Sequence, residues 1–167
     1  GDLLAYCRNE QGGTGGSQLY LARTASWQPI QIADDLFCQG LPQLGFDWSP
    51  DGTTIAYTRS FVYGPQADGS QWSKYHGIWA VDVASGQSSE LITPPGTNPL
   101  VYPRWSPDGR WIRLYELVYM EGLGVLRTWN RDNGTLFNWL GVGTDMFPGS
   151  SDWSPDSVRL VFDQVTY

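Results

Sequence analysis

Residues 46–58 read FDWSPDGTTIAYT, and two further stretches of the chain repeat this pattern. Residues 103–115 read PRWSPDGRWIRLY and residues 151–163 read SDWSPDSVRLVFD, so the three tryptophans lie 57 and 48 residues apart. The chain opens with GDLLAYCR, which matches the second half of the pattern and makes Leu4 equivalent to Ile55. A motif that recurs at a fixed spacing of about 50 residues is the signature of a repeat protein.

The segments between the motifs alternate between apolar and polar residues, which is typical of half-buried β-strands. Within Ser-Pro-Asp-Gly, proline suits the second position of a tight turn and glycine closes it. Asn133-Gly134 and Ser85-Gly86 predict hairpin turns later in each unit. Each repeat is therefore expected to hold four strands, counting the one that ends at the tryptophan. Ser157 departs from the glycine of the other copies, at a cost on the order of 1 kcal/mol if φ is positive there.

The composition excludes several classes of protein. The chain has 167 residues, a net charge of −7 and 41% hydrophobic residues, which argues against disorder. The acidic balance, with Lys74 as the only lysine, speaks against a nucleic-acid partner, and no apolar run is long enough for membrane insertion. Two cysteines and one histidine cannot fill an ordinary zinc site, and no metal or other cofactor is expected.

The repeated Trp-Ser-Pro-Asp-Gly, followed by an apolar strand, resembles the repeat of TolB-like β-propellers, which are relatives of the WD-type repeats. The resemblance covers nearly the whole chain. It implies an all-β segment of about three four-stranded antiparallel blades, belonging to a propeller of about six to eight blades. In that family the motif is a turn beside the innermost strand, so it marks the fold and not a catalytic site. The structural residues of the repeat are Trp48, Asp51, Trp105, Asp108, Trp153 and Asp156.

With the strands of a blade lettered A to D outward, the resemblance also predicts the blade boundaries. Blade 1, with strands B to D only, covers about residues 1–44. Blades 2 and 3 cover about residues 45–100 and 101–149, and the first two strands of blade 4 cover about residues 150–167. We expect a piece of a longer propeller. The rival interpretation is that two chains assemble a six-bladed ring, which would make the protein a homodimer.

One segment interrupts the regularity of the repeat. Residues 61–76 read FVYGPQADGSQWSKYH and form a predicted insertion between strands B and C of blade 2. Aromatic residues on a rigidly supported loop favour a recognition surface. The candidate partner-binding residues are Phe61, Tyr63, Trp72, Tyr75, His76 and, on a neighbouring connection, Phe147. The alternative is that the loop buries these aromatic residues against its own blade.

The sequence predicts a non-catalytic binding or scaffold module for protein–protein interaction, and no catalytic residue is named. The partner is another protein, the remaining blades of the propeller or a second copy. Similar repeats also form the propeller of prolyl-oligopeptidase-like serine peptidases, so the alternative is a regulatory propeller whose catalytic domain lies elsewhere. The resemblance implies a periplasmic or extracellular location. The sequence leaves open whether Cys7 and Cys38 form a disulfide or remain two buried thiols.

Overall fold

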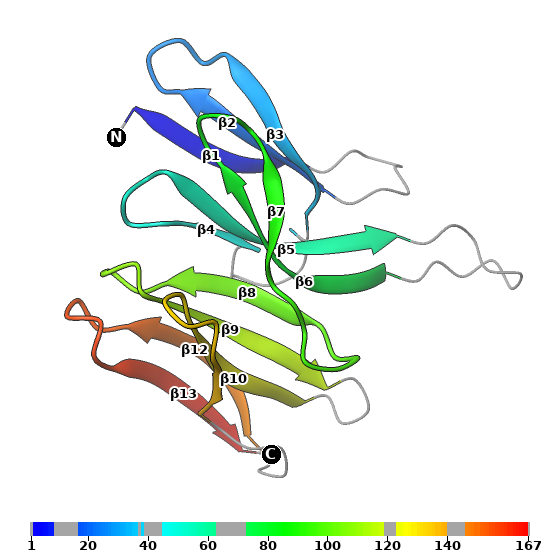
Figure 1. Ribbon diagram of the computed structural model, residues 1–167, viewed down its shortest axis with the longest axis vertical. Helices are drawn as coiled ribbons and strands as arrows, with labels where there is room; N and C mark the ends of the chain where they lie inside the picture. The colour runs from blue at the N-terminus through cyan, green and yellow to red at the C-terminus, as the bar shows by residue number, and fades with distance from the viewer. Residues whose placement is uncertain are drawn as a thin grey trace, which may run out of the picture.

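The computed structural model is built from antiparallel β-sheets (Figure 1). The residues that it describes form strands, turns and bends and contain no helix. These residues are 2–8, 17–36, 38, 45–62, 73–118, 123–139 and 146–166. The expectation of an all-β fold is confirmed.

The first blade has three strands, which are β1 (Leu3–Arg8), β2 (Ser17–Arg23) and β3 (Pro29–Leu36). The strands pair antiparallel in sequence order, and Leu4 lies opposite Ala22. A disulfide joins Cys7 on β1 to Cys38, just beyond β3, with a Cα–Cα distance of 6.4 Å. This bond ties the first strand of the blade to the connection that follows the third.

The second blade has all four strands, which are β4 (Phe46–Trp48), β5 (Thr54–Val62), β6 (Ser73–Asp82) and β7 (Ser88–Ile92). Trp48 pairs with Ile55 across the Ser-Pro-Asp-Gly turn, as the repeat predicts. A single pair, Leu36 with Arg59, connects the sheet of blade 1 to that of blade 2. The ends of the predicted loop 61–76 were wrong, because β5 continues to Val62 and β6 begins at Ser73.

The third blade repeats the four-strand order with β8 (Leu100–Trp105), β9 (Trp111–Val118), β10 (Leu123–Asn130) and β11 (Leu136–Asn138). The fourth unit contributes a two-stranded sheet of β12 (Met146–Trp153) and β13 (Leu160–Thr166). Trp105 pairs with Ile112 and Trp153 with Leu160, which is the same register as in blade 2. The described strands therefore follow the order that the repeat predicts, with blades stacked in a row (Figure 1).

The core consists of apolar layers between successive blades. Ile55 and Tyr57 of β5 pack towards Leu19 and Leu36 of blade 1, and all four side chains are at most 2% exposed. A second layer joins blade 2 to blade 3, and its buried members are Ala56, Ile78, Ile92, Leu100, Trp105, Ile112, Leu114 and Trp129. Burial of each large apolar side chain contributes about 1.5–3 kcal/mol. Successive residues of one strand therefore hold a blade against both of its neighbours.

Candidate functional site

The repeated aspartate closes the turn in each motif. In blade 2, the Ser49 hydroxyl donates to Asp51 Oδ1 at 2.6 Å, and the backbone N–H of Thr53 donates to the same oxygen at 3.0 Å. These hydrogen bonds stabilise the carboxylate, and they lower the pKa of Asp51 to about 2. Asp51 therefore acts on its own turn.

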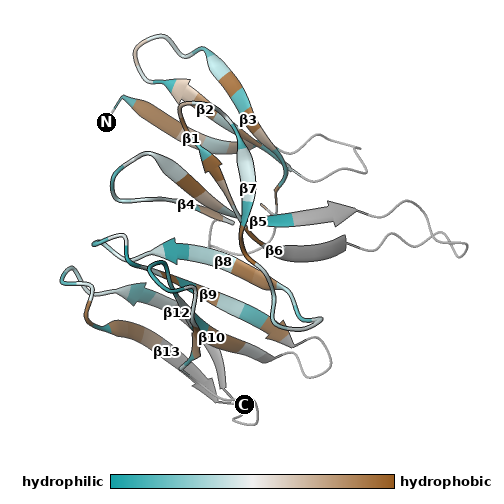
Figure 2. Ribbon diagram, viewed as in Figure 1, coloured by the Kyte–Doolittle hydropathy of each residue, from teal (hydrophilic) through white to brown (hydrophobic). Residues whose placement is uncertain are grey.

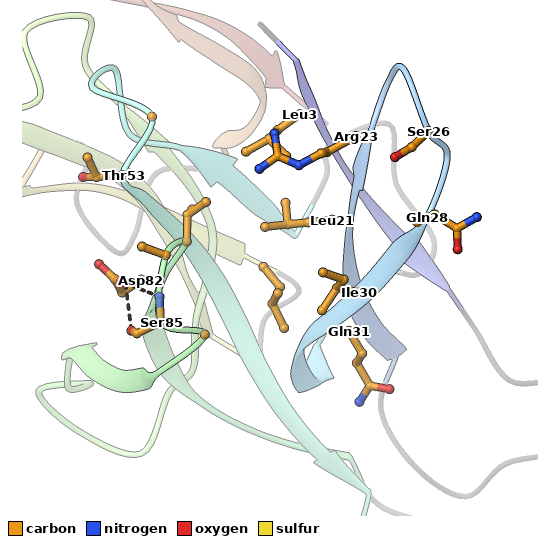
Figure 3. Close-up of a pocket in the computed structure, with 15 residues that line it drawn as sticks. Leu3, Leu21, Arg23, Ser26, Gln28, Ile30, Gln31, Thr53, Asp82 and Ser85 are labelled. Atoms are coloured by element: carbon orange, nitrogen blue, oxygen red, sulfur yellow. Dashed lines mark hydrogen bonds between the residues drawn. The ribbon is translucent and has the colours of Figure 1, made fainter.

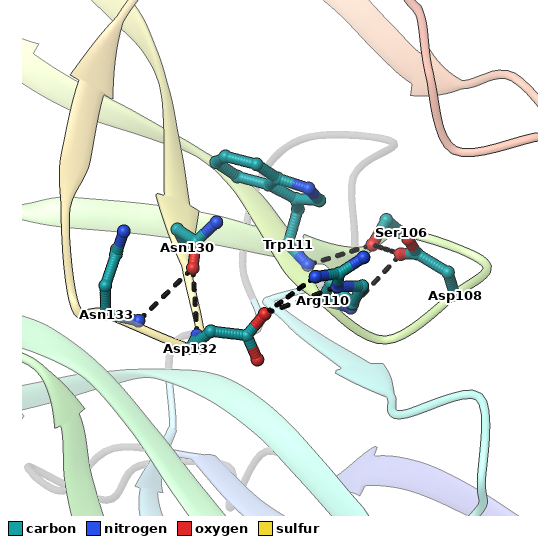
Figure 4. Close-up of polar contacts among 7 residues, drawn as sticks. All are labelled: Ser106, Asp108, Arg110, Trp111, Asn130, Asp132 and Asn133. Atoms are coloured by element: carbon teal, nitrogen blue, oxygen red, sulfur yellow. Dashed lines mark hydrogen bonds and ion pairs between the residues drawn. The ribbon is translucent and has the colours of Figure 1, made fainter.

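The other two copies of the turn repeat these contacts. Asp108 accepts from the Ser106 hydroxyl at 2.5 Å and from the backbone N–H of Arg110 at 3.1 Å (Figure 4). Burial raises the pKa of Asp108, but these hydrogen bonds outweigh it and keep the pKa below its usual range. Asp156 accepts from the Ser154 hydroxyl, which lowers its pKa in the same way. All three aspartates lie in turns and make structural contacts.

The tryptophans of the motif lie at the boundaries between blades. Trp105 is 7% exposed and belongs to the core layer between blades 2 and 3. Trp48 is half-buried and packs against the layer between blades 1 and 2. Trp153 is half-buried, and its indole Nε1–H donates to the carbonyl oxygen of Arg104 in blade 3 at 3.2 Å. Trp153 thereby joins the fourth unit to the third.

Charged side chains link the innermost strands of neighbouring blades. Asp47 Oδ2 accepts the backbone N–H of Trp105 at 2.8 Å, and Arg104 Nη1 donates to the carbonyl of Phe46 at 2.7 Å. Burial raises the pKa of Asp47, although the Trp105 hydrogen bond opposes this. Sequence reasoning missed these two residues. The sequence did contain a signal, because the residue before each motif tryptophan is charged in all three copies, as Asp, Arg and Asp.

Arg113 makes the same kind of link one blade further on. It is 2% exposed, and its Nη2 donates to the carbonyl of Ser151 on β12 at 2.7 Å. Burial lowers its pKa to about 10, because the charged form loses hydration. Tyr115 lies beside it and shares a 2.7 Å hydrogen bond with the Ser151 hydroxyl. An arginine in the middle of an apolar strand was the signal that sequence reasoning did not use.

A groove of about 890 Å³ lies between blades 1 and 2 (Figure 3). Its blade 1 side carries Leu21 and Ile30, and its blade 2 side carries the turn from Asp82 to Gly86. The Asp82 carboxylate accepts from the backbone N–H of Ser85 at 2.7 Å and from its hydroxyl at 2.8 Å. These contacts lower the pKa of Asp82 and use its acceptor oxygen within the turn.

A smaller cavity of about 360 Å³ lies between the same blades. The guanidinium of Arg59 lies 3.9 Å from the ring centroid of Trp79, and its Nη2 is 3.7 Å from Asp35 Oδ2. Asp35 has a φ of 57°, which is uncommon for a residue other than glycine. Arg59 therefore connects blade 2 to blade 1 through its ion pair with Asp35, whereas its stack on Trp79 lies within blade 2.

Exposed aromatic residues gather at the outer edge of blade 3. Phe137 is 44% exposed and Trp139 is 54% exposed, and the ring of Phe137 lies 5.8 Å from that of Trp111. Trp139 is held in place by a 2.8 Å hydrogen bond from its indole Nε1–H to the Thr128 hydroxyl. A shallow pocket of about 350 Å³ opens among these side chains. Sequence reasoning did not single out this cluster.

The predicted partner-binding residues fall at the edge of what the structure describes. Phe61 lies on β5, Tyr75 and His76 on β6, and Phe147 on β12, as strand positions whose side chains are not described. Tyr63 and Trp72 lie outside the described residues. The β5–β6 pairing brings Phe61 opposite Lys74 and Ser60 opposite Tyr75, so these positions share one two-stranded ribbon. Phe147 pairs instead with Val165 in the fourth unit.

The described residues also bear on metal binding and membrane insertion. Among these residues, no group of three or more histidine, cysteine, aspartate or glutamate side chains comes together. The same part of the chain contains no helix with the length and apolar character needed to cross a membrane.

No protein-family model matches the chain. An uncharacterised WD repeat-containing protein of Deinococcus radiodurans is 35% identical over 72 residues, which are 42% of this chain and 25% of the relative. An uncharacterised protein of Agrobacterium fabrum is 31% identical over 111 residues, which are 66% of this chain and 32% of the relative. The chain thus spans between a quarter and a third of the length of these curated relatives.

Solved structures share the fold over nearly the whole chain. A TolB-like structure from Agrobacterium tumefaciens has a TM-score of 0.65 at 23% identity and covers 99% of this chain and 51% of its own. A prolyl endopeptidase structure has a TM-score of 0.61 at 19% identity and covers 98% of this chain and 25% of its own.

The four-stranded units, their shared turn and these similarities define a β-propeller module. Its repeats resemble those of TolB-like and WD repeat-containing proteins. The aspartates of the repeat make structural contacts within their own turns.

Proposed function

We propose that this chain is a non-catalytic propeller module that binds another protein, and that the β5–β6 ribbon is its recognition element. The observation that carries the proposal is the length of this ribbon. Beyond the register shift after Arg59, β5 and β6 stay paired, with Phe61 opposite Lys74 and Val62 opposite Ser73. Aromatic positions on a paired ribbon lose little conformational entropy on binding, which favours recognition.

The base of the ribbon is tightly packed. A register shift separates Arg59 from Ser60, and Gly77 lies opposite Arg59 at this point. A Cβ atom at Gly77 would lie 2.5 Å from the carbonyl oxygen of Ile92 and 3.0 Å from Pro94 Cδ. The ribbon therefore rises from a place where β6 contacts the end of β7 closely. This supports a rigid attachment for the residues beyond it.

The charged residues named above outside the β5–β6 ribbon are engaged in structural contacts, which supports a binding role rather than a catalytic one. Asp47, Arg104 and Arg113 hold neighbouring blades together, and Asp51 and Asp108 close turns. Side chains engaged in such contacts stabilise the scaffold. The proposed recognition residues are Phe61, Tyr75 and His76 on the ribbon, Tyr63 and Trp72 in the stretch of sequence between β5 and β6, and Phe147.

Site-specific photocrosslinking tests the proposal. A photoreactive phenylalanine analogue at Tyr75 is expected to trap a partner protein in an extract of the producing cells, whereas the same analogue at Trp27 on blade 1 serves as the matched control. Trp72→Ala introduced beside the Tyr75 probe is expected to reduce the trapped product at least tenfold, because aromatic anchors carry much of an interface's binding energy. Equal trapping from both probes, or trapping unaffected by Trp72→Ala, would overturn the proposal.

We also propose that the protein works in the periplasm or outside the cell. The Cys7–Cys38 disulfide supports this location, because such bonds persist in oxidising compartments and are rare in the cytosol. The similarity to TolB-like structures agrees with it. Fractionation of producing cells, with the thiols alkylated at lysis, is expected to find the chain oxidised and outside the cytoplasm. A reduced cytoplasmic chain would contradict this location.

A second candidate function is the regulatory propeller of a prolyl-oligopeptidase-like serine peptidase. The similarity to a prolyl endopeptidase structure favours it, since the likeness covers 98% of this chain. A Gly-x-Ser-x-Gly motif in the same full-length open reading frame, together with hydrolysis of proline-containing peptides by its product, would support this candidate. A full-length product without that motif and without such activity would exclude it.

A further inference from the structure

The groove and the smaller cavity between blades 1 and 2 adjoin each other and form one cleft. Ile32 of β3 and Gly86 of the β6–β7 turn line both spaces, so the two meet at these residues. Their volumes of about 890 and 360 Å³ lie in the range that ligand-binding clefts occupy. The walls discussed below are β3 of blade 1 and the outer part of blade 2, so the chain itself supplies both sides of the cleft.

The cleft is open because blade 2 carries small side chains where blade 3 carries large ones. Val81 and Trp129 hold the same repeat position, since each pairs with the residue opposite a motif tryptophan. Trp129 is buried in the core layer between blades 2 and 3. Two residues further along, blade 2 has Val83, whereas blade 3 has Arg131, whose guanidinium lies 5.6 Å from the ring centroid of Trp105. The smaller side chains of blade 2 leave space between it and blade 1.

The blade 1 wall presents apolar side chains to this space. β3 alternates between hydrophobic and hydrophilic positions (Figure 2). Ile30 is 67% exposed although blade 2 follows it, and the equivalent position of blade 2 is the polar Ser89. Figure 3 shows Leu21 and Ile30 pointing towards the turn from Asp82 to Ser85. An apolar side chain that stays exposed inside a cleft favours an apolar ligand, because the ligand removes it from water.

The smaller cavity contains a buried hydrogen-bond donor that lacks an acceptor. The indole Nε1–H of Trp79 is buried and has no hydrogen-bond partner within the described part of the chain. Trp79 is one of the residues that line the cavity, which offers space for an acceptor. A buried donor without a partner destabilises the protein, because it has lost its hydrogen bonds to water. A ligand that brings a carbonyl oxygen to Trp79 would restore this hydrogen bond.

The same cavity carries an excess of negative charge. The charge of Arg59 is balanced by Asp35, at 3.7 Å from Nη2 to Oδ2. Asp34 also lines the cavity and is exposed. Its carboxylate accepts a hydrogen bond from the side-chain amide of Gln31, but it has no cationic partner among the residues that the structure describes. A lysine or arginine side chain of a ligand would complement this carboxylate.

The length of the cleft fits an extended peptide. The two spaces follow β3 from Ile30 to Asp34. A strand rises about 3.3 Å per residue, so this stretch measures roughly 13 Å, which is the length of about four residues of extended chain.

We infer that this cleft binds an extended segment of a partner protein that combines apolar residues with a basic one. The apolar side chains of the segment pack on Ile30 and Ile32. A backbone carbonyl accepts the Nε1–H of Trp79, and the basic side chain pairs with Asp34. The inference rests on the proposed protein-binding role, but it assigns a second surface that is separate from the β5–β6 ribbon.

Selection from a phage-displayed library of random seven-residue peptides tests the inference on the intact 167-residue chain. The selected peptides are expected to combine two or more apolar residues with a lysine or arginine. In titrations with the synthetic peptides, Ile30→Gln is expected to weaken binding at least tenfold and Asp34→Asn at least fivefold. Val158→Gln and Asp132→Asn are the matched controls, because both positions are exposed and lie outside blades 1 and 2. The controls are expected to change binding less than twofold.

Trp79→Phe removes the indole donor and keeps an aromatic ring beside Arg59. It is expected to weaken peptide binding at least fivefold with little change in the unfolding midpoint.

Several outcomes would overturn the inference. These are a selection that yields no peptide, selected peptides without a basic residue, and binding that Ile30→Gln leaves unchanged. Hexylamine that competes as strongly as the peptides would identify a small amphiphilic amine as the ligand and refute a protein segment. A Tyr75 probe that traps a partner while no peptide binds the cleft would refute this inference and leave the proposed function standing. Peptide binding without trapping at Tyr75 would support the cleft and refute the ribbon.

Discussion

The carboxylate of Asp47 in blade 2 accepts the backbone N–H of Trp105 in blade 3, at 2.8 Å and across 58 residues of sequence. Arg104 returns a hydrogen bond to the carbonyl of Phe46 at 2.7 Å, so the two inner strands are joined in both directions. These strands do not share a β-ladder. Charged side chains at one position of the repeat therefore set the register between the two blades.

Asp47→Ala is expected to destabilise the chain by about 1–3 kcal/mol, because it leaves a partly buried N–H without its acceptor. Asp152→Ala is the matched control, since Asp152 occupies the same repeat position but is exposed and bonds to the adjacent Trp153 N–H at 2.8 Å. The control is expected to change stability by less than about 0.5 kcal/mol. Urea midpoints at neutral pH measure both variants. Equal midpoints would show that Asp47 does not fix the register.

The turn aspartates predict a loss of stability in acid. The pKa of Asp51 is lowered to about 2 by its hydrogen bonds, so its stabilising effect is present above its ordinary pKa of 3.8 and is lost as the pH falls towards 2. The stability difference between the unaltered chain and Asp51→Asn is therefore expected to shrink between pH 5 and pH 2. Chemical denaturation at several pH values measures this difference. A constant difference would contradict the assigned role.

Gly77→Ala is expected to destabilise the chain by about 1–3 kcal/mol through overpacking at the base of the ribbon. The new Cβ atom would meet the carbonyl oxygen of Ile92 at 2.5 Å. Gly96→Ala is the control, because no atom lies within 4 Å of the added carbon there. Thermal unfolding of the two variants provides the comparison. A Gly77→Ala midpoint equal to that of Gly96→Ala would show that the ribbon is loosely attached.

Reduction of the Cys7–Cys38 disulfide is expected to lower the free energy of unfolding by about 3–4 kcal/mol on the chain-entropy model. The bond closes a loop with a sequence separation of 31 residues. Urea unfolding with and without a reducing agent measures the effect. The double variant Cys7→Ser and Cys38→Ser should match the reduced chain and show no response to the reductant. A double variant as stable as the oxidised chain would contradict the prediction.

The repeat made the fold predictable, because its strands and turns are local and recur three times. The Trp48–Ile55 pairing and the positive φ at Gly52 follow from a short motif. The contacts between blades did not follow, since Asp47 and Trp105 belong to different motifs and meet only in three dimensions. The sequence could not decide whether Cys7 and Cys38 form a disulfide, for the same reason. Two cysteines 31 residues apart can pair only if the blade brings them together.

The candidate sites, too, could be predicted from the sequence only in part. The sequence predicted the aromatic insertion from Phe61 to His76, because it interrupts a regular repeat. The prediction placed a loop where β5 and β6 are still paired, because the alternation of apolar and polar residues is hard to recognise beside polar residues and glycine. The exposed aromatic cluster on blade 3 was missed, since Trp111 and Phe137 lie on separate strands and become neighbours only through the pairing of β9 to β10 and β10 to β11.

The thermal unfolding midpoint of Trp72→Ala tests the central claim, that the segment from Phe61 to His76 carries exposed recognition residues, most directly. A residue that faces a partner contributes within about 0.5 kcal/mol to folding, so the midpoint is expected to move by no more than about 2 °C. Trp105→Ala, which removes a core side chain, serves as the reference for a buried tryptophan and is expected to cost about 3–5 kcal/mol. A midpoint for Trp72→Ala that stays with the unaltered chain supports the account, and one that falls with Trp105→Ala contradicts it.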